Sequence, residues 1–197
     1  MIEEYLRQPY QFYFINPLAN YLQNKVTPNQ ITILSGVLGL FVLPTLLMNY
    51  VYFSIFLLVL SGICDTLDGT LARMQQKSSD WGSVLDIICD RIVEITVVLS
   101  LFAIAPAERG TPALLMLASM LLCITSFLVV GIFTVNETHK SFHYSPGLME
   151  RAEAFIFFIA MMLWPHYFNI LAFLFIALVL LTAIIRLMQF HSQYRLI

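Results

Sequence analysis

Residues 51–90 read VYFSIFLLVLSGICDTLDGTLARMQQKSSDWGSVLDIICD. The stretch begins as a long apolar run and then carries Asp65 and Asp68, and after a short polar link it carries Asp86 and Asp90 at the start of a second apolar run. Acidic side chains inside long apolar helices are energetically costly, so they usually mark a functional site. These residues therefore predict two helices that bring four carboxylates to neighbouring ends.

The composition of the whole chain agrees with helices in a lipid environment. Of the 197 residues, 59% are hydrophobic and 11% are charged, and the mean hydropathy is +0.82. This is more apolar surface than one soluble core of this size would bury. The apolar runs match the length of about 20 residues that a helix needs to cross a bilayer. We expect an all-α integral membrane protein, with residues 1–197 forming a single membrane domain.

Six transmembrane helices are predicted, at about residues 31–49, 51–74, 82–105, 112–134, 149–164 and 167–189. A short interfacial amphipathic helix precedes them within residues 1–26, with Asn16 as its cap and Leu18, Tyr21 and Leu22 on one face. The Thr27-Pro28-Asn29-Gln30 sequence is a capping box that starts the first span. No cleaved signal is expected, because acidic residues stand where a signal has basic ones.

The basic residues predict the orientation of these spans. An even number of spans puts both termini on one side, and that side also holds the loop between spans two and three and the loop between spans four and five. It would contain Arg7, Lys25, Arg73, Lys77, Arg91, Lys140, Arg151, Arg186 and Arg195. Because basic residues favour the cytoplasmic face, we expect a bacterial-type inner membrane protein with its termini and acidic site facing the cytoplasm.

The acidic residues have helical spacing. One face of the first helix carries Asp65, Asp68, Gly69 and Ala72, and one face of the second carries Gly82, Asp86 and Asp90. Four convergent carboxylates repel one another unless they are neutralised, and two divalent cations would cancel their formal charges. Oxygen ligands favour Mg²⁺ or Mn²⁺.

Residues near the acids favour a phosphate-containing ligand with a flat group. Arg73 follows Gly69 by one helical turn, so its guanidinium can bind a phosphate at the same end of the helix. Gly69 and Gly82 suggest that something approaches the backbone closely, such as a nucleotide base. Close packing between helices is the alternative for either glycine.

The motif in residues 65–90 resembles a known family signature. Asp65 to Arg73, Gly82, Asp86 and Asp90 fit every fixed position of D-x-x-D-G-x-x-A-R-x8-G-x-x-x-D-x-x-x-D, the signature of the CDP-alcohol phosphatidyltransferases. Six spans after an interfacial helix are also similar to the fold of that family.

This resemblance implies a role for each motif position. Asp65, Asp68 and Asp86 would bind metal, and Asp90 would join them or act as the base that takes the proton of the acceptor. Arg73 would hold the phosphates of the donor. The small residues Gly69, Ala72 and Gly82 would make room for cytidine. A homodimer is also implied.

A looser resemblance concerns the acceptor alcohol. The stretches Gly147–Glu153 and Asp90–Glu94 are similar to family members that use a phosphorylated polyol, such as glycerol 3-phosphate or inositol phosphate. Arg151 and Lys140 are the candidate acceptor-binding residues. Arg151 can instead pair with a neighbouring glutamate or anchor its helix at the lipid headgroups.

We therefore expect an enzyme that transfers a phosphatidyl group from CDP-diacylglycerol to a small alcohol and releases CMP, with membrane lipids and no nucleic acid among its partners. The first alternative is an aminoalcohol phosphotransferase that uses CDP-choline or CDP-ethanolamine, because the metal motif is shared. The second alternative is a six-span ion carrier, because acids in membrane helices also line ion pathways.

Overall fold

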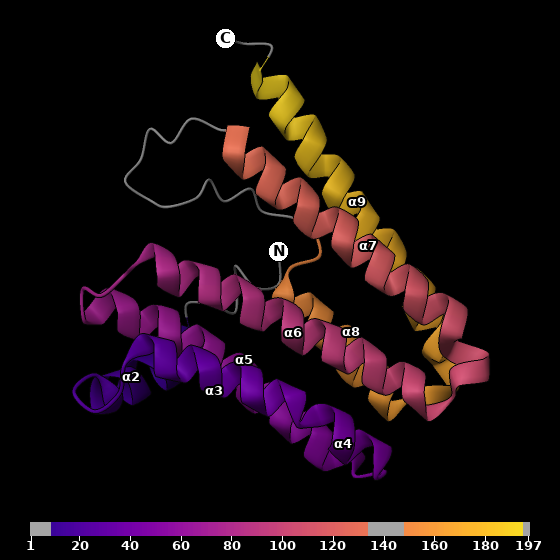
Figure 1. Cartoon of the computed structure of the whole chain (residues 1–197), viewed down its shortest axis with the longest axis horizontal. Coiled ribbons are helices and arrows are strands. Elements are labelled where there is room, and N and C mark those ends of the chain that lie inside the picture. Colours follow the sequence, from indigo (N-terminus) through magenta and orange to yellow (C-terminus); the bar gives the residue numbers. More distant parts are fainter. Residues whose placement is uncertain (1–8, 134–147, 195–197) are drawn as a thin grey trace. The chain divides into compact units, whose positions relative to one another are not determined.

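The computed structural model describes residues 9–133 and 148–194, and all secondary structure in these ranges is helical. The chain divides into two compact units, Met1–Pro106 and Ala107–Ile197. Figure 1 shows the course of the helices from the indigo N-terminal segment to the yellow C-terminal one. The predicted all-α fold is therefore confirmed for the described residues.

The helices follow the predicted order. They are η1 (Gln11–Ile15, a π-helix), α2 (Asn16–Leu22), α3 (Pro28–Leu40), α4 (Val42–Leu47), α5 (Val51–Met74), α6 (Asp80–Ile104), α7 (Pro106–Phe133), α8 (Arg151–Leu163), η2 (Pro165–Tyr167, a 3-10 helix) and α9 (Phe168–Tyr194). The α5 helix has the predicted bounds. The α7 helix begins at Pro106, earlier than predicted, and includes Pro112 in its interior.

Four stretches of the described chain are long and apolar enough to cross a membrane: Pro28–Leu47, Val51–Met74, Pro106–Phe133 and Pro165–Ser192. This makes the chain an integral membrane protein. The predicted spans at residues 82–105 and 149–164 are not among these four, because the first carries too many charges and the second is too short. The α6 helix carries Asp80, Asp86, Asp90, Arg91 and Glu94, and α8 has 13 residues.

Local sequence explains both the start of the first predicted span at Pro28 and its break at Phe41. Its N-terminus has the expected capping box, in which the backbone N–H of Thr27 donates to Oε1 of Gln30 at 2.9 Å. The helix then breaks at Phe41 between α3 and α4. Pro44 explains the break, because it has no N–H to donate to the carbonyl of Leu40 and its ring crowds that carbonyl.

The N-terminal segment is helical, and it packs on the first unit through Ile15 and Ala19. Asn16 is not a cap, because its backbone N–H already donates to the carbonyl of Gln11 in the preceding π-helix. Ile15 and Ala19 are buried, whereas Leu18 and Tyr21 are exposed. The buried pair joins a cluster with Ile31 of α3 and residues of α5, so this segment packs on the first unit. Its location at a membrane interface stays a prediction.

The α3 helix connects the two helices that carry the acidic motif. Both α5 and α6 pack along α3 (Figure 1). Towards α5, the Ser35 hydroxyl donates to the carbonyl of Ser61 at 2.9 Å, and the Ser61 hydroxyl donates to the carbonyl of Ser35 at 2.9 Å. These reciprocal bonds fix the register of α3 against α5.

Towards α6, α3 presents two glycines. A Cβ built on Gly39 would lie 2.8 Å from Cγ1 and 2.9 Å from Cβ of Val93. Gly36 is less restricted, because a Cβ there would lie 3.3 Å from Sγ of Cys89. Gly39 is therefore a point of close approach between α3 and α6, where an added side chain requires Val93 or the helices to shift.

In the second unit, α8 packs on α9. The α9 helix is also tied to α7, because the Arg186 guanidinium donates to the carbonyl of Cys123 at 3.1 Å and to the Ser126 hydroxyl at 3.3 Å.

We predict that Gly39→Ala lowers the free energy of unfolding by about 1–3 kcal/mol, because the added methyl group overpacks the contact with Val93. Thermal unfolding of the purified protein in detergent measures the effect. Gly36→Ala is the matched control, since the same change on the same helix meets only the edge of Cys89. Equal stability of the two variants would show that packing at Gly39 and Val93 is not tight enough to exclude a methyl group.

Candidate metal centre

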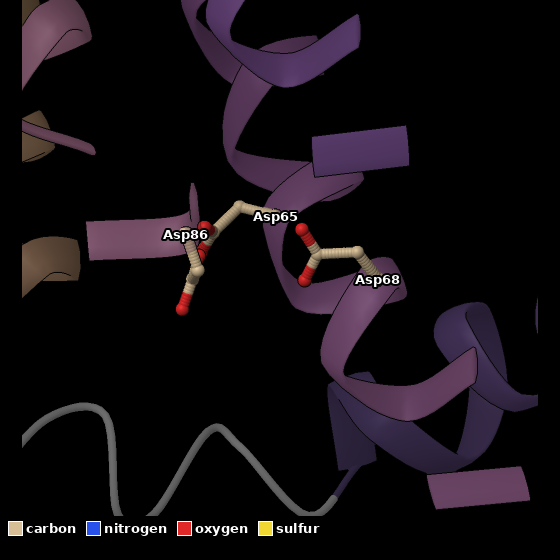
Figure 2. Close-up of side chains that lie close together, drawn as sticks. All are labelled: Asp65, Asp68 and Asp86. Atoms are coloured by element: carbon tan, nitrogen blue, oxygen red, sulfur yellow. The ribbon is translucent and has the colours of Figure 1, made fainter. Parts of the chain in front are cut away.

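Three of the four motif carboxylates converge in the first unit. Asp65 and Asp68 lie on α5 and Asp86 lies on α6, and each offers a carboxylate oxygen within 4.8 Å of the others. Figure 2 shows the three side chains directed at a common space from the two helices. This is the spacing that a shared cation requires, because two ligand oxygens on one ion lie closer together than about 5 Å when each bond is about 2.0–2.6 Å long.

Local sequence explains why these side chains share a direction. Asp65 and Asp68 are three residues apart on α5 and so lie on one face. The start of α6 is set by Ser79, whose hydroxyl accepts a hydrogen bond from the backbone N–H of Gly82 at 3.1 Å. Asp86 then falls one turn beyond Gly82, close to the C-terminal half of α5.

Asp68 is the most buried member of the group, with 5% of its surface exposed. Its Oδ2 atom is fully buried and has no hydrogen-bond partner among the described residues. The Thr32 side chain of α3 lies beside the same carboxyl group. A buried carboxylate oxygen without a donor is unfavourable, and a cation at its free lone pair would stabilise it. The three residues therefore fit a divalent metal ion with oxygen ligands.

Asp90 lies one turn beyond Asp86 on α6 and outside the group of three carboxylates. It remains near enough for its charge to interact with that of Asp68. On the next turn the buried Glu94 forms an ion pair with Arg91. Acidic residues on α6 therefore continue beyond the group of three carboxylates. Asp90 lies next to that group and is not a member of it.

Arg73 and the small motif residues lie beside the carboxylates at the end of α5. The Arg73 side chain is exposed, and its Nη2 donates to the Thr70 hydroxyl at 3.1 Å. A Cβ on Gly69 would meet only Nη1 of Arg73, at 3.7 Å. Gly69 thus leaves an open surface over which the guanidinium folds. Ala72 is half-buried on the same helix.

Gly82 has closer neighbours than Gly69. A Cβ there would lie 3.2 Å from the Ser79 hydroxyl oxygen and 3.3 Å from Oδ1 of Asn29. The space at Gly82 is therefore shared with the cap of α6 and with the start of α3. The assignment of Gly69, Ala72 and Gly82 to a cytidine site stays a prediction.

The two predicted acceptor-binding residues lie elsewhere in the chain. Arg151 is the first residue of α8 in the second unit, and its guanidinium lies 5.3 Å from the ring centroid of Phe155. Glu150 and Glu153 form a capping box with each other at this helix start. Lys140 lies outside the described residues. The acceptor role of both residues stays a prediction.

Sequence reasoning missed two polar residues near Arg73, namely Thr70, which accepts a hydrogen bond from Arg73, and Gln11, which donates to Thr70. Thr70 occupies a variable position of the motif, so the motif does not predict a role for its hydroxyl. Its position next to Gly69 was the one feature that could have drawn attention to it. Gln11 is far away in sequence and donates to Thr70 at 2.8 Å. No local pattern could reveal that contact, because it depends on how the N-terminal helix packs on α5.

Comparisons with known proteins give one consistent result. A family model described as CDP-alcohol phosphatidyltransferase matches residues 25–187. The phosphatidylinositol phosphate synthase of Corynebacterium glutamicum is 33% identical over 76% of this chain and 68% of its own length. The inner membrane protein YnjF of Escherichia coli is 28% identical over 82% of this chain and 81% of its own length.

The fold also matches solved structures of one protein, the Mycobacterium tuberculosis phosphatidylinositol phosphate synthase PgsA1. Its crystal structure with CDP-DAG bound has a TM-score of 0.75 and 22% identity, and covers 90% of this chain and 93% of that one. Its complex with manganese and citrate has a TM-score of 0.74 and 21% identity, and covers 89% and 88%. The chain therefore shares the fold of that synthase.

We predict that Asp68→Asn makes the metal-free protein more stable and removes its stabilisation by Mn²⁺ or Mg²⁺. The change relieves repulsion among the acids and removes a ligand. For the unsubstituted protein, an ion at about 100 times its Kd should add about 2.7 kcal/mol. Thermal unfolding with EDTA and with each metal measures both effects. Asp80→Asn, an exposed acid at the start of α6, should keep the full metal response; loss of the response there as well would contradict a local site.

Proposed function

This chain belongs to the CDP-alcohol phosphatidyltransferase family, and from that membership we propose that it transfers the phosphatidyl group of CDP-diacylglycerol to a phosphorylated polyol and releases CMP. The observation that carries the proposal is the convergence of Asp65, Asp68 and Asp86, on α5 and α6, within 4.8 Å. An acidic group of this kind beside an arginine suits a pyrophosphate, which needs cations on several oxygens.

The proposed reaction assigns a task to each motif residue. Asp65, Asp68 and Asp86 would hold the divalent metal ions, which supply positive charge to the pyrophosphate oxygens when bound. Arg73 would bind a phosphate of the same donor through its forked N–H groups. The fixed carboxylates and the guanidinium would thus hold the phosphatidyl phosphorus in one orientation for attack.

Asp90 is proposed as the general base. The acceptor hydroxyl loses its proton to the Asp90 carboxylate as its oxygen forms a bond to the phosphatidyl phosphorus, and the bond from that phosphorus to the oxygen of CMP breaks. Its position outside the group of three carboxylates favours this role over that of an equal ligand. A carboxylate bound to a cation is a poor proton acceptor, whereas one that lies a turn away keeps its basicity.

Two divalent ions are proposed for the complete site. The four motif acids carry four formal negative charges, which two ions would balance. Oxygen ligands suit both Mg²⁺ and Mn²⁺, and manganese is present in one of the related M. tuberculosis structures.

The proposed acceptor is inositol phosphate or a similar phosphorylated polyol such as glycerol 3-phosphate. Support comes from the C. glutamicum relative, which is named a phosphatidylinositol phosphate synthase. Arg151 and Lys140 are the proposed cations for the phosphate of the acceptor. We also propose a homodimer, a cytoplasmic site and cytoplasmic termini, the last two from the distribution of basic residues.

We predict that the purified protein with Mn²⁺ or Mg²⁺ releases CMP from CDP-diacylglycerol when inositol phosphate or glycerol 3-phosphate is present. Chromatography of the nucleotide and lipid products measures the reaction. CDP-choline and CDP-ethanolamine with diacylglycerol should give little CMP, because the proposed donor carries the lipid on the nucleotide. Turnover of those donors alone would select the aminoalcohol alternative, and cation flux in vesicles without CMP release would select the ion carrier.

We predict that Asp90→Asn lowers kcat by about 10²–10⁴-fold, the usual contribution of a general base. The stabilisation of the protein by Mn²⁺ should be largely retained, because the group of three carboxylates remains. Turnover and thermal unfolding of the same preparation separate the two roles. If the metal response disappears together with activity, Asp90 is a ligand instead.

A further inference from the structure

The N-terminal helix makes a polar contact with the acidic end of α5 that the proposed reaction does not use. The Gln11 side chain belongs to the π-helical segment and reaches α5 through its amide, which donates to the Thr70 hydroxyl at 2.8 Å. The same amide nitrogen lies 3.3 Å from Oδ1 of Asn16. Thr70 is 4% exposed and Gln11 is half-buried, so this hydrogen bond is partly shielded from solvent.

The Thr70 hydroxyl has a complete set of partners. It donates its one proton to the carbonyl of Thr66 at 2.9 Å, and it accepts from Gln11 and from Nη2 of Arg73. Because its only proton is already donated, the group that Gln11 presents to it must be a donor. Gln11 and Arg73 therefore donate to the same hydroxyl oxygen, which links the N-terminal segment to the guanidinium of Arg73.

Gln11 can influence the conformation of the Arg73 side chain through the Thr70 hydroxyl, to which both residues donate. A threonine in a helix divides between two rotamers, because its hydroxyl can bond to the preceding turn in either. In the structure the Thr70 hydroxyl bonds to the carbonyl of Thr66 in the preceding turn, and in this rotamer its oxygen accepts from both Gln11 and Arg73. Since Arg73 is exposed, its long side chain otherwise samples many conformations, and that freedom is lost when it binds a phosphate.

We propose that Gln11 is a positioning residue for the CDP-linked donor: through the Thr70 hydroxyl it holds the Arg73 guanidinium ready for the donor phosphate. This inference rests on the proposed function, because it takes Arg73 as the phosphate-binding residue. It gives the N-terminal helix a task in substrate affinity, whereas its apolar contacts at Ile15 and Ala19 serve packing alone.

The test uses the full chain and measures kcat and KM for CDP-diacylglycerol. Gln11→Met keeps the length of the side chain and removes the amide, and Thr70→Val keeps the shape and removes the hydroxyl. Each change should raise KM by about 3–10-fold, the range expected for one hydrogen bond, with kcat within about twofold of the unsubstituted protein. The double variant should be no worse than the worse single variant, because both changes break one chain of bonds. Thr70→Ser should restore the affinity.

Gln75 provides a matched control for mere loosening of the N-terminal segment. Its amide donates to the carbonyls of Gln23 at 2.7 Å and Val26 at 2.9 Å, so it also ties this segment to the end of α5. Gln75→Met should lower thermal stability and leave KM unchanged. An equal rise of KM in Gln75→Met, or an unchanged KM in Gln11→Met, would overturn the positioning role.

Binding of CDP separates this inference from the proposed function. Calorimetric titration with CDP and Mn²⁺ should show about 3–10-fold weaker binding to Gln11→Met than to the unsubstituted protein. If the unsubstituted protein releases no CMP from any CDP-lipid, the proposed function fails, and CDP affinity still decides the role of Gln11. Equal CDP affinity of Gln11→Met and the unsubstituted protein would refute the positioning role of Gln11.

Discussion

Close approach of α3 to α6 at Gly39 and Val93 is the contact on which the acidic site depends. The α3 helix is also joined to α5 by the reciprocal hydrogen bonds of Ser35 and Ser61. The two motif helices are thus both packed on a third helix. This arrangement lets their carboxylates approach one another without a layer of side chains between them.

Such an arrangement is unfavourable on its own, and the cost explains the proposed chemistry. Asp65, Asp68 and Asp86 bring like charges within 4.8 Å, and one oxygen of Asp68 is buried without a donor. The packing of α3 against both helices offsets this repulsion before any ion binds. A cation then gains several ligands at once with little reorganisation of the protein, which is the condition for strong electrostatic stabilisation of a phosphate group.

Much of this arrangement could be predicted from local sequence, because it follows from helical periodicity. The bounds of α5, the capping box at Thr27 and the shared faces of the aspartates all depend on residues a few positions apart. Contacts between distant segments could not be predicted in this way. The π-helix that removes Asn16 as a cap, the contact of Gln11 with Thr70, and the separate place of Asp90 depend on packing between helices. Six spans were predicted from apolar runs, but the charges of α6 and the shortness of α8 leave four clear candidates in the described chain.

The central claim is that α5 and α6 hold a divalent cation between their acidic faces. Anomalous diffraction from crystals grown with Mn²⁺ tests it most directly, because the manganese signal locates the ion without assumptions about activity. We predict a strong anomalous peak in contact with carboxylate oxygens of Asp65, Asp68 and Asp86. A manganese peak elsewhere, or ordered carboxylates with no peak between them, would contradict the account.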